Sequence, residues 1–144
     1  MASVVAVCTS DKKGQKKQQV GEASLRENFG ITSDAHADAK SHRQVSLLAL
    51  ASIEKMQAMG ADVGPGAFAE NLTVEGMQLY TLPLGTRFVI GESVILELTQ
   101  VGKECHDRCA IFKQVGTCVM PLEGVFTRVI KGGVVKAGDE VKLV

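Results

Sequence analysis

The segment Thr86–Gln100 reads TRFVIGESVILELTQ and contains the strongest strand signal in the chain. Thr86–Ile90 passes from the polar residues Thr86 and Arg87 into the apolar run Phe88–Ile90, and it reads as a strand. Gly91-Glu92 is a candidate turn of the kind that joins antiparallel strands, and Ser93–Gln100 continues as a second strand. The segment therefore predicts a β-hairpin in a strand-rich protein.

The stretch Leu82–Ile90 has an internal counterpart in Val135–Leu143. In each, a turn containing a glycine leads through a charged or polar residue into an apolar strand. Repeated turn-and-strand units around a single main helix favour a closed or nearly closed β-barrel, because closure removes exposed strand edges. We therefore expect a mainly β fold, a β-barrel with one main helix and short additional helical segments, in a single domain over residues 1–144.

Other elements follow from local patterns. The main helix is expected at about residues 49–59, where apolar residues recur at helical spacing before Gly60. One helical turn is expected within Leu25–Ile31. The lysine-rich run Asp11–Gln19 is expected to be a solvated loop, although such a run can also close over an anionic ligand. Further strands are expected at Ser3–Cys8, Gln44–Leu48, Phe68–Val74, Gln78–Thr81, Gly124–Ile130, Val134–Val135 and Glu140–Val144.

Composition limits the possible classes of function. Lys plus Arg and Asp plus Glu are equal at 16 each, and a net charge of zero argues against broad nucleic-acid binding. No apolar run approaches the length of a membrane span, and Met1–Cys8 resembles a first strand more than a signal peptide. Four cysteines without a secretion signal indicate a cytoplasmic location, where thiols stay reduced, rather than a disulfide scaffold.

A thiol follows the second strand of the hairpin, within the stretch Thr99–Cys109. Lys103 and His106 stand within two residues of Cys105, and nearby positive charge favours the thiolate. The thiolate is the form that attacks, carries sulfur or binds a metal, so we interpret Cys105 as a functional residue. Cys109 has three possible roles: a resolving partner, a metal ligand beside Cys105, or a residue at the start of a helix.

A basic cluster precedes the strand expected at Gln44–Leu48. His36, His42 and Arg43 occur within eight positions there, and together they predict an anion-binding rim. Arg is suited to this role because its planar guanidinium contacts phosphate with two hydrogen bonds.

Two further groups of polar residues are candidates. Glu70 and Asn71 interrupt an apolar run. They are either solvated residues of an edge strand, or a carboxylate and an amide that face a pocket and read a ring edge rich in donors and acceptors. Arg128 and Lys131 are candidate phosphate ligands, although a strand followed by a hairpin turn also explains the pattern there.

Several short motifs follow one another along the chain in a characteristic order. They are Asp34-Ala-His36-Ala37, His42–Leu48, Phe68-Ala-Glu70–Thr73, Leu82-Pro-Leu-Gly85-Thr86, Gln100 with Cys105 five residues on, Glu123–Phe126, Gly132-Gly133 and Gly138-Asp139. Together they resemble the MOSC domain, the module found at the C-terminus of molybdenum cofactor sulfurases and as short stand-alone proteins. The resemblance covers nearly the whole chain and implies a β-barrel. Leu122 stands where many relatives have Arg, so Arg43, Arg128 and the Lys12–Lys17 run would have to supply that positive charge.

The resemblance also implies a ligand and a role for each candidate residue. Cys105 matches the family's cysteine, which holds a persulfide in members proposed as sulfur carriers and ligates molybdenum in members that act as reductases. The implied ligand is the molybdenum cofactor, in its molybdopterin form. The residues that would bind it are Arg43, Arg128 and Lys103 at the pterin phosphate, with His42 beside them, and His36, Glu70 and Asn71 at the pterin.

The implied partner is a cysteine desulfurase, or a molybdoenzyme or cofactor-maturation protein. Pyridoxal phosphate belongs to the larger domains that accompany the module in other family members, and this sequence shows no sign of those domains. No nucleic-acid or membrane partner is expected.

Three hypotheses follow. The first is a MOSC module that binds the molybdenum cofactor or transfers its sulfur through Cys105. The second is a cofactor-dependent reductase of N-hydroxylated compounds, with Cys105 as a molybdenum ligand. The third is a non-catalytic metal-binding module that uses Cys105, His106, Cys109 and Cys118, whose spacing loosely resembles that of zinc ligands. Cys8 and Cys118 lie in apolar runs and are interpreted as buried small hydrophobic residues.

Overall fold

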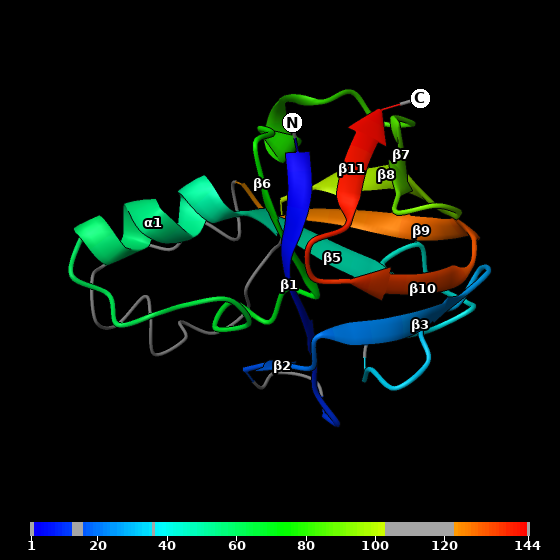
Figure 1. Ribbon diagram of the computed structural model, residues 1–144, viewed down its shortest axis with the longest axis horizontal. Helices are drawn as coiled ribbons and strands as arrows, with labels where there is room; N and C mark the ends of the chain where they lie inside the picture. The colour runs from blue at the N-terminus through cyan, green and yellow to red at the C-terminus, as the bar shows by residue number, and fades with distance from the viewer. Residues whose placement is uncertain (1, 13–15, 36, 103–122, 144) are drawn as a thin grey trace.

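The computed structural model describes residues 2–12, 16–35, 37–102 and 123–143 (Figure 1). Its elements, in chain order, are β1 (Ala2–Thr9), β2 (Gln18–Gln19), β3 (Glu22–Arg26), β4 (Gly30–Ile31), β5 (Val45–Ala49), α1 (Leu50–Ala58), β6 (Leu72–Glu75), the 3-10 helix η1 (Leu79–Thr81), β7 (Arg87–Ile90), β8 (Val94–Val101), β9 (Val125–Lys131), β10 (Gly133–Lys136) and β11 (Glu140–Leu143).

Seven of these strands form a closed barrel in the order β11-β7-β8-β9-β5-β6-β1. The barrel closes where β1 pairs antiparallel with β11, through Ala2 opposite Val141 and Ser3 opposite Glu140. Strand β2 extends this sheet beyond β1, and β10, β3 and β4 form a separate three-stranded sheet. The predicted mainly β fold, a barrel with one main helix, is confirmed.

Alternation along the strands fills the barrel interior with apolar side chains. On β8, Val94, Leu96 and Leu98 are buried, whereas Ile95 and Glu97 between them are partly exposed. This period of two is the geometric signature of a strand with one buried face. Because the interior of the barrel is occupied by side chains, a ligand has to bind at its outer surface or its ends.

Helix α1 continues from β5 and projects to one side of the barrel (Figure 1). Strand β5 leads directly into α1, and the chain returns through β6, which pairs parallel with β5 (Figure 1). Every residue of β5 is buried because its two faces serve two cores. Leu47 packs inside the barrel, whereas Leu48 joins a second apolar cluster that includes Ile53 and Met56 of α1 and Phe126 of β9.

Two local predictions are wrong. The segment Leu25–Ile31 contains no helical turn: β3 alternates between buried and exposed residues, and the chain then reverses into β4 through Asn28, whose φ is 51°. The segment Gln78–Thr81 is not a strand but contains η1. The backbone N–H groups of Thr81 and Leu82 donate to the carbonyl groups three residues earlier, so they do not pair with a neighbouring strand.

The strand expected from Phe68 begins only at Leu72. No helix in the described part of the chain has both the length and the apolar character needed to cross a membrane.

Two glycines with the same backbone conformation provide a matched test of the packing between the loops. Gly66 and Gly85 both have φ of +91°. A Cβ atom at Gly66 would overlap the carbonyl oxygen of Lys17 and lie 3.3 Å from Sγ of Cys8, whereas one at Gly85 would meet nothing within 4 Å.

We expect Gly85→Ala to lower the free energy of unfolding by about 1–2 kcal/mol, the cost of the left-handed backbone alone. Gly66→Ala should lower it by about 2–5 kcal/mol, because overpacking is added to that cost. Urea denaturation of the two variants measures the difference. Equal losses would contradict the close approach of Gly66 to Lys17.

Candidate functional site

A β-bulge near the end of β8 shapes the most polar part of the barrel rim. Leu98 lies opposite Thr127 on β9, but Gln100 lies opposite Phe126, so Thr99 is an extra residue on β8. Regular alternation would bury Gln100 on the side of Leu98, yet both Thr99 and Gln100 are partly exposed. Bulges re-aim side chains in this way and are frequent beside functional sites.

The two residues at the bulge hold two basic residues in place. Oγ1 of Thr99 lies 2.8 Å from Nδ1 of His42 and 3.1 Å from the carbonyl oxygen of His42. Nε of Arg43 donates to Oε1 of Gln100 at 3.1 Å, and the Arg43 guanidinium lies 5.6 Å from the centre of the Phe126 ring. We call His42, Arg43, Thr99 and Gln100 the rim site.

The rim site has exposed basic side chains that can donate to an anion. Arg43 and His42 are both exposed. Nε of Arg43 is bound to Gln100, and the guanidinium lies over the Phe126 ring, so two contacts restrict its position. Within the described ranges, no residue accepts a hydrogen bond from the Nη atoms of Arg43. A phosphate or carboxylate could therefore accept charge-assisted hydrogen bonds from them.

Arg128 does not belong to the rim site. Its Nη2 donates to Oε1 of Glu97 at 3.2 Å, while Nε of Arg87 donates to Oε2 of the same carboxylate at 3.2 Å. Arg128 is a partly exposed residue of β9, two residues after Phe126, and its contact is with Glu97 rather than with the rim site.

Glu70 and Asn71 are fully buried, so the interpretation of them as solvated residues of an edge strand is wrong. The Glu70 carboxylate accepts hydrogen bonds from the backbone N–H groups of Gly66 at 3.0 Å and Phe68 at 3.1 Å, and from Oγ1 of Thr73 at 3.1 Å. These bonds fold the loop between α1 and β6 around the carboxylate. The role expected for Glu70 at a pterin stays a prediction.

Asn71 ties the same loop to two strands. Its Oδ1 accepts from the backbone N–H of Ser46 on β5 at 2.9 Å, and its Nδ2 donates to the carbonyl oxygen of Cys8 on β1 at 3.1 Å. The amide therefore bridges strands that the barrel places on either side of β6. Its expected role at a pterin also stays a prediction.

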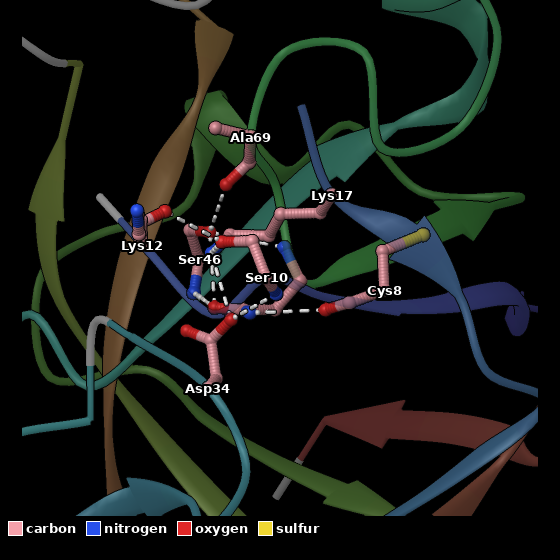
Figure 2. Close-up of polar contacts among 8 residues, drawn as sticks. Cys8, Ser10, Lys12, Lys17, Asp34, Ser46 and Ala69 are labelled. Carbon is pink, nitrogen blue, oxygen red and sulfur yellow. Dashed lines mark hydrogen bonds and ion pairs between the residues drawn. The ribbon is translucent and has the colours of Figure 1, made fainter. Parts of the chain in front are cut away.

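A buried ion pair lies next to this loop. Nζ of Lys17 is 2.7 Å from Oδ1 of Asp34 and donates to Oγ of Ser10 at 3.0 Å, as Figure 2 shows. Both charged side chains are 0% exposed. The prediction of a wholly solvated lysine-rich loop is therefore wrong at Lys17, because a lysine can be buried when a carboxylate and a hydroxyl compensate its charge. The pair fixes Asp34, which begins the motif Asp34-Ala-His36-Ala37.

Cys8 is buried, as expected, and is not a reactive thiol. Its burial, with a smaller contribution from the Glu70 carboxylate, raises the pKa of the thiol to about 12, although Lys17 acts in the opposite direction. The thiol therefore stays protonated at neutral pH and behaves as a small apolar group.

Several predicted residues lie outside the described residues: His36, Lys103, Cys105, His106, Cys109 and Cys118. Within the described ranges, no group of three or more His, Cys, Asp and Glu residues is arranged to hold a metal ion.

The described residues that flank positions 103–122 are firmly held beside the rim site. The backbone N–H of Gly102 donates to the carbonyl oxygen of Gly124 at 2.6 Å, and Nε2 of Gln100 donates to the carbonyl oxygen of Gly102 at 2.8 Å. On α1, Ser52 Oγ and Lys55 Nζ bind the Glu123 carboxylate at 2.6 Å and 2.5 Å. The chain therefore leaves β8 and returns to β9 at adjacent points.

A shallow depression of about 420 Å³ lies at the opposite end of β5, where α1 begins. Glu54, Glu75 and Gln78 are among its lining residues. Two carboxylates make it a poor site for an anion, in contrast to the rim site.

Sequence reasoning missed two features of the site, the bulge at Thr99 and the pairing of Lys17 with Asp34. A signal for the bulge exists in Gln100, a polar residue at a position that alternation from Leu98 assigns to the interior. No local pattern relates Lys17 to Asp34, because the loops that carry them meet only in the folded barrel.

The buried carboxylate of Glu70 predicts a pH dependence of stability. Burial raises the pKa of Glu70 above its ordinary value of 4.5, against the effect of its hydrogen bonds. The folded protein therefore binds this proton more tightly than the unfolded chain does, and the contribution of Glu70 to stability declines as pH rises from 4.5 through the raised pKa.

We therefore compare the free energy of unfolding of the wild type with that of Glu70→Gln. The wild-type value minus the variant value should fall as pH rises over this range. Urea denaturation at a series of pH values measures it, with Glu22→Gln as the control for the loss of an exposed carboxylate. A difference between wild type and Glu70→Gln that rises with pH would show that the hydrogen bonds outweigh burial.

Comparison with known proteins agrees with the fold. The sequence model of the MOSC domain family matches residues 32–142 of this chain. A search of curated proteins finds no match. The solved structure of the YuaD protein of Bacillus subtilis is 20% identical in sequence and superposes with a TM-score of 0.81, over 99% of this chain and 96% of that chain.

Two YiiM structures are also similar. The protein of Geobacillus stearothermophilus is 18% identical, with a TM-score of 0.73 over 100% of this chain and 75% of that chain. The protein of Escherichia coli is 22% identical, with a TM-score of 0.69 over 100% of this chain and 70% of that chain. At these identities the likeness establishes the fold, whereas the family match covers the rim site and most of the barrel. The chain therefore belongs to the MOSC domain family.

Proposed function

We propose that this protein binds the molybdenum cofactor or transfers its sulfur, with Cys105 as the residue that carries sulfur or ligates molybdenum. One observation carries the proposal. The residues at the bulge, Thr99 and Gln100, bind the side chains of His42 and Arg43 at the end of the strand that leads to Cys105, and this arrangement is suited to an anion. Membership of the MOSC family connects this arrangement with molybdenum cofactor chemistry at the level of the family.

The described residues fit the charge of the cofactor. The pterin phosphate is anionic, and Arg43 offers its Nη donors beside the contacts with Gln100 and Phe126 that hold the guanidinium. Arg43 would hold the phosphate, and His42 would contact it through Nε2, because its Nδ1 is already bound to Thr99. When bound, the cofactor would supply a molybdenum centre whose soft character suits a thiolate ligand.

The other residues expected at the cofactor would act at longer range. Arg128 and Lys103 would add positive charge near the phosphate. Glu70 and Asn71 would orient the pterin by fixing the loop between α1 and β6, since their polar atoms already bind protein groups. His36 follows Asp34, whose position is set by Lys17, so this ion pair would define where the His36 segment begins.

Cys105 follows Gly102 by three residues, a stretch that spans at most roughly 11 Å. Gly102, the last described residue before Cys105, is itself bound to the side chain of Gln100 in the rim site. The cations Arg43 and Lys103 would favour the thiolate form of Cys105. A reducing cytoplasm would keep that thiol free of disulfides.

The sulfur-transfer step is a thiol–persulfide exchange with no net oxidation or reduction. The Cys105 thiolate attacks the outer sulfur of a persulfide on the donor protein, and a new S–S bond forms at Cys105. The S–S bond of the donor breaks, and the donor cysteine leaves as a thiolate. The expected donor is a cysteine desulfurase.

Mass spectrometry tests the role of Cys105. After incubation with a cysteine desulfurase and L-cysteine, we expect one added sulfur atom on Cys105, because the more reactive thiolate is modified first. Cys109→Ser should still be modified at Cys105, whereas Cys105→Ser should not be modified at all. Modification that is unchanged in Cys105→Ser would contradict the carrier role. Molybdenum that co-purifies, with reduction of hydroxylamino-purines, would identify a reductase instead.

Binding of molybdopterin tests the rim site. We expect Arg43→Gln to weaken binding by about tenfold to a hundredfold, the effect of losing hydrogen bonds from a charged group to the phosphate. Lys40→Gln is a matched control, because it removes one exposed positive charge from the same loop. Pterin fluorescence measures both affinities. Equal weakening in the two variants would show a general charge effect and would refute a specific site at Arg43.

A further inference from the structure

The outer face of β7, β8 and β9 carries an ordered set of side chains that the rim site does not use. Its first row crosses three strands: Arg87 lies directly opposite Glu97, and Glu97 directly opposite Arg128. Both arginines bind the one carboxylate at 3.2 Å and remain 48% and 43% exposed. Because two cations share one anion, the row has an excess of positive charge.

A second row is apolar at its centre and basic at its ends. Val89 lies directly opposite Ile95, and both are partly exposed on the side of the sheet away from the core. Lys142 on β11 lies opposite Val89, and Lys131 on β9 lies opposite Ile95. We call the two rows the ladder face; its residues are Arg87, Val89, Ile95, Glu97, Arg128 and Lys142, with Lys131 at the edge.

The ladder face has the composition of a protein interface. An apolar centre within a charged, solvent-exposed rim is the usual anatomy of such interfaces, and Arg is enriched in them. The face carries four cations against two carboxylates, Glu97 and the Glu140 that lies 3.8 Å from Lys142. The whole chain has a net charge of zero, so this excess is local.

We propose that the ladder face docks the protein that donates sulfur to Cys105, through an acidic surface of that donor. The proposal rests on the function proposed above. Strand β8 crosses the ladder face and ends at Val101, which is four residue steps, or roughly 13 Å, beyond Glu97. A donor seated on this face therefore stands beside the point where the chain departs toward Cys105.

Charge selects this occupant over the alternatives. Two copies of the chain that met through this face would bring like charges together, which disfavours a symmetric dimer. Glu97 at the centre of the arginine row, with apolar side chains beside it, suits a mixed protein surface more than a nucleic-acid backbone. An acidic donor would gain both attraction at the rim and burial of Val89 and Ile95.

The test measures binding separately from sulfur chemistry. The Cys105→Ser protein is titrated with the purified cysteine desulfurase of the same organism, and the affinity is read by fluorescence anisotropy. Added to this background, Arg87→Glu should weaken binding at least about tenfold, and the loss should shrink near 1 M salt, where charges are screened within about 3 Å. Glu97→Gln should tighten binding.

Lys136→Glu is the matched control, because it makes the same change of charge at an exposed position on β10 in the other sheet. It should change the affinity by less than about twofold. No detectable binding to the unaltered ladder face, or equal losses in Arg87→Glu and Lys136→Glu, would overturn the proposal. A DNA oligonucleotide that binds as tightly, with the same loss in Arg87→Glu, would also overturn it.

Different results would refute the docking surface and the carrier role of Cys105. Binding that depends on Arg87 while Cys105 of the wild type acquires no sulfur would refute the carrier role and leave the docking surface standing. Sulfur on Cys105, together with binding that does not depend on Arg87, would refute the docking surface and leave the carrier role standing.

Discussion

The pairing of β1 with β11 is the constraint on which the rest of the molecule depends. It joins the two ends of the chain and closes the barrel, so that none of its seven strands is left with an open edge. Closure also fills the interior with apolar side chains such as Phe88, Leu96 and Val129. Chemistry must therefore take place outside the barrel, where irregular features of the strands direct polar side chains.

The bulge at Thr99 is the irregularity that creates the rim site. Without the extra residue, Gln100 would point toward the core and Arg43 would lose its partner. Buried polar groups fix the positions of the loops through their hydrogen bonds. Glu70 and the pair of Lys17 with Asp34 are costly to bury, and they remain because each is bound by several groups from different segments.

Much of the barrel follows from local pattern, because alternation on β8 and helical spacing on α1 record which face each element buries. The ordered motifs also identify the family. Sequence does not reveal which strands close the barrel or that Lys17 is buried, since both depend on contacts between distant segments. The error at Leu25–Ile31 has a similar origin: pairing with β10, far along the chain, makes β3 a strand.

Hydrogen–deuterium exchange with and without molybdopterin tests most directly where the anion binds. We expect slower exchange in peptides that contain His42 and Arg43 and in those that contain Thr99–Gly102, because a ligand on the rim site stabilises the hydrogen bonds that hold it. Slower exchange confined to the depression at the start of α1, near Leu50 and Gln78, would contradict the account.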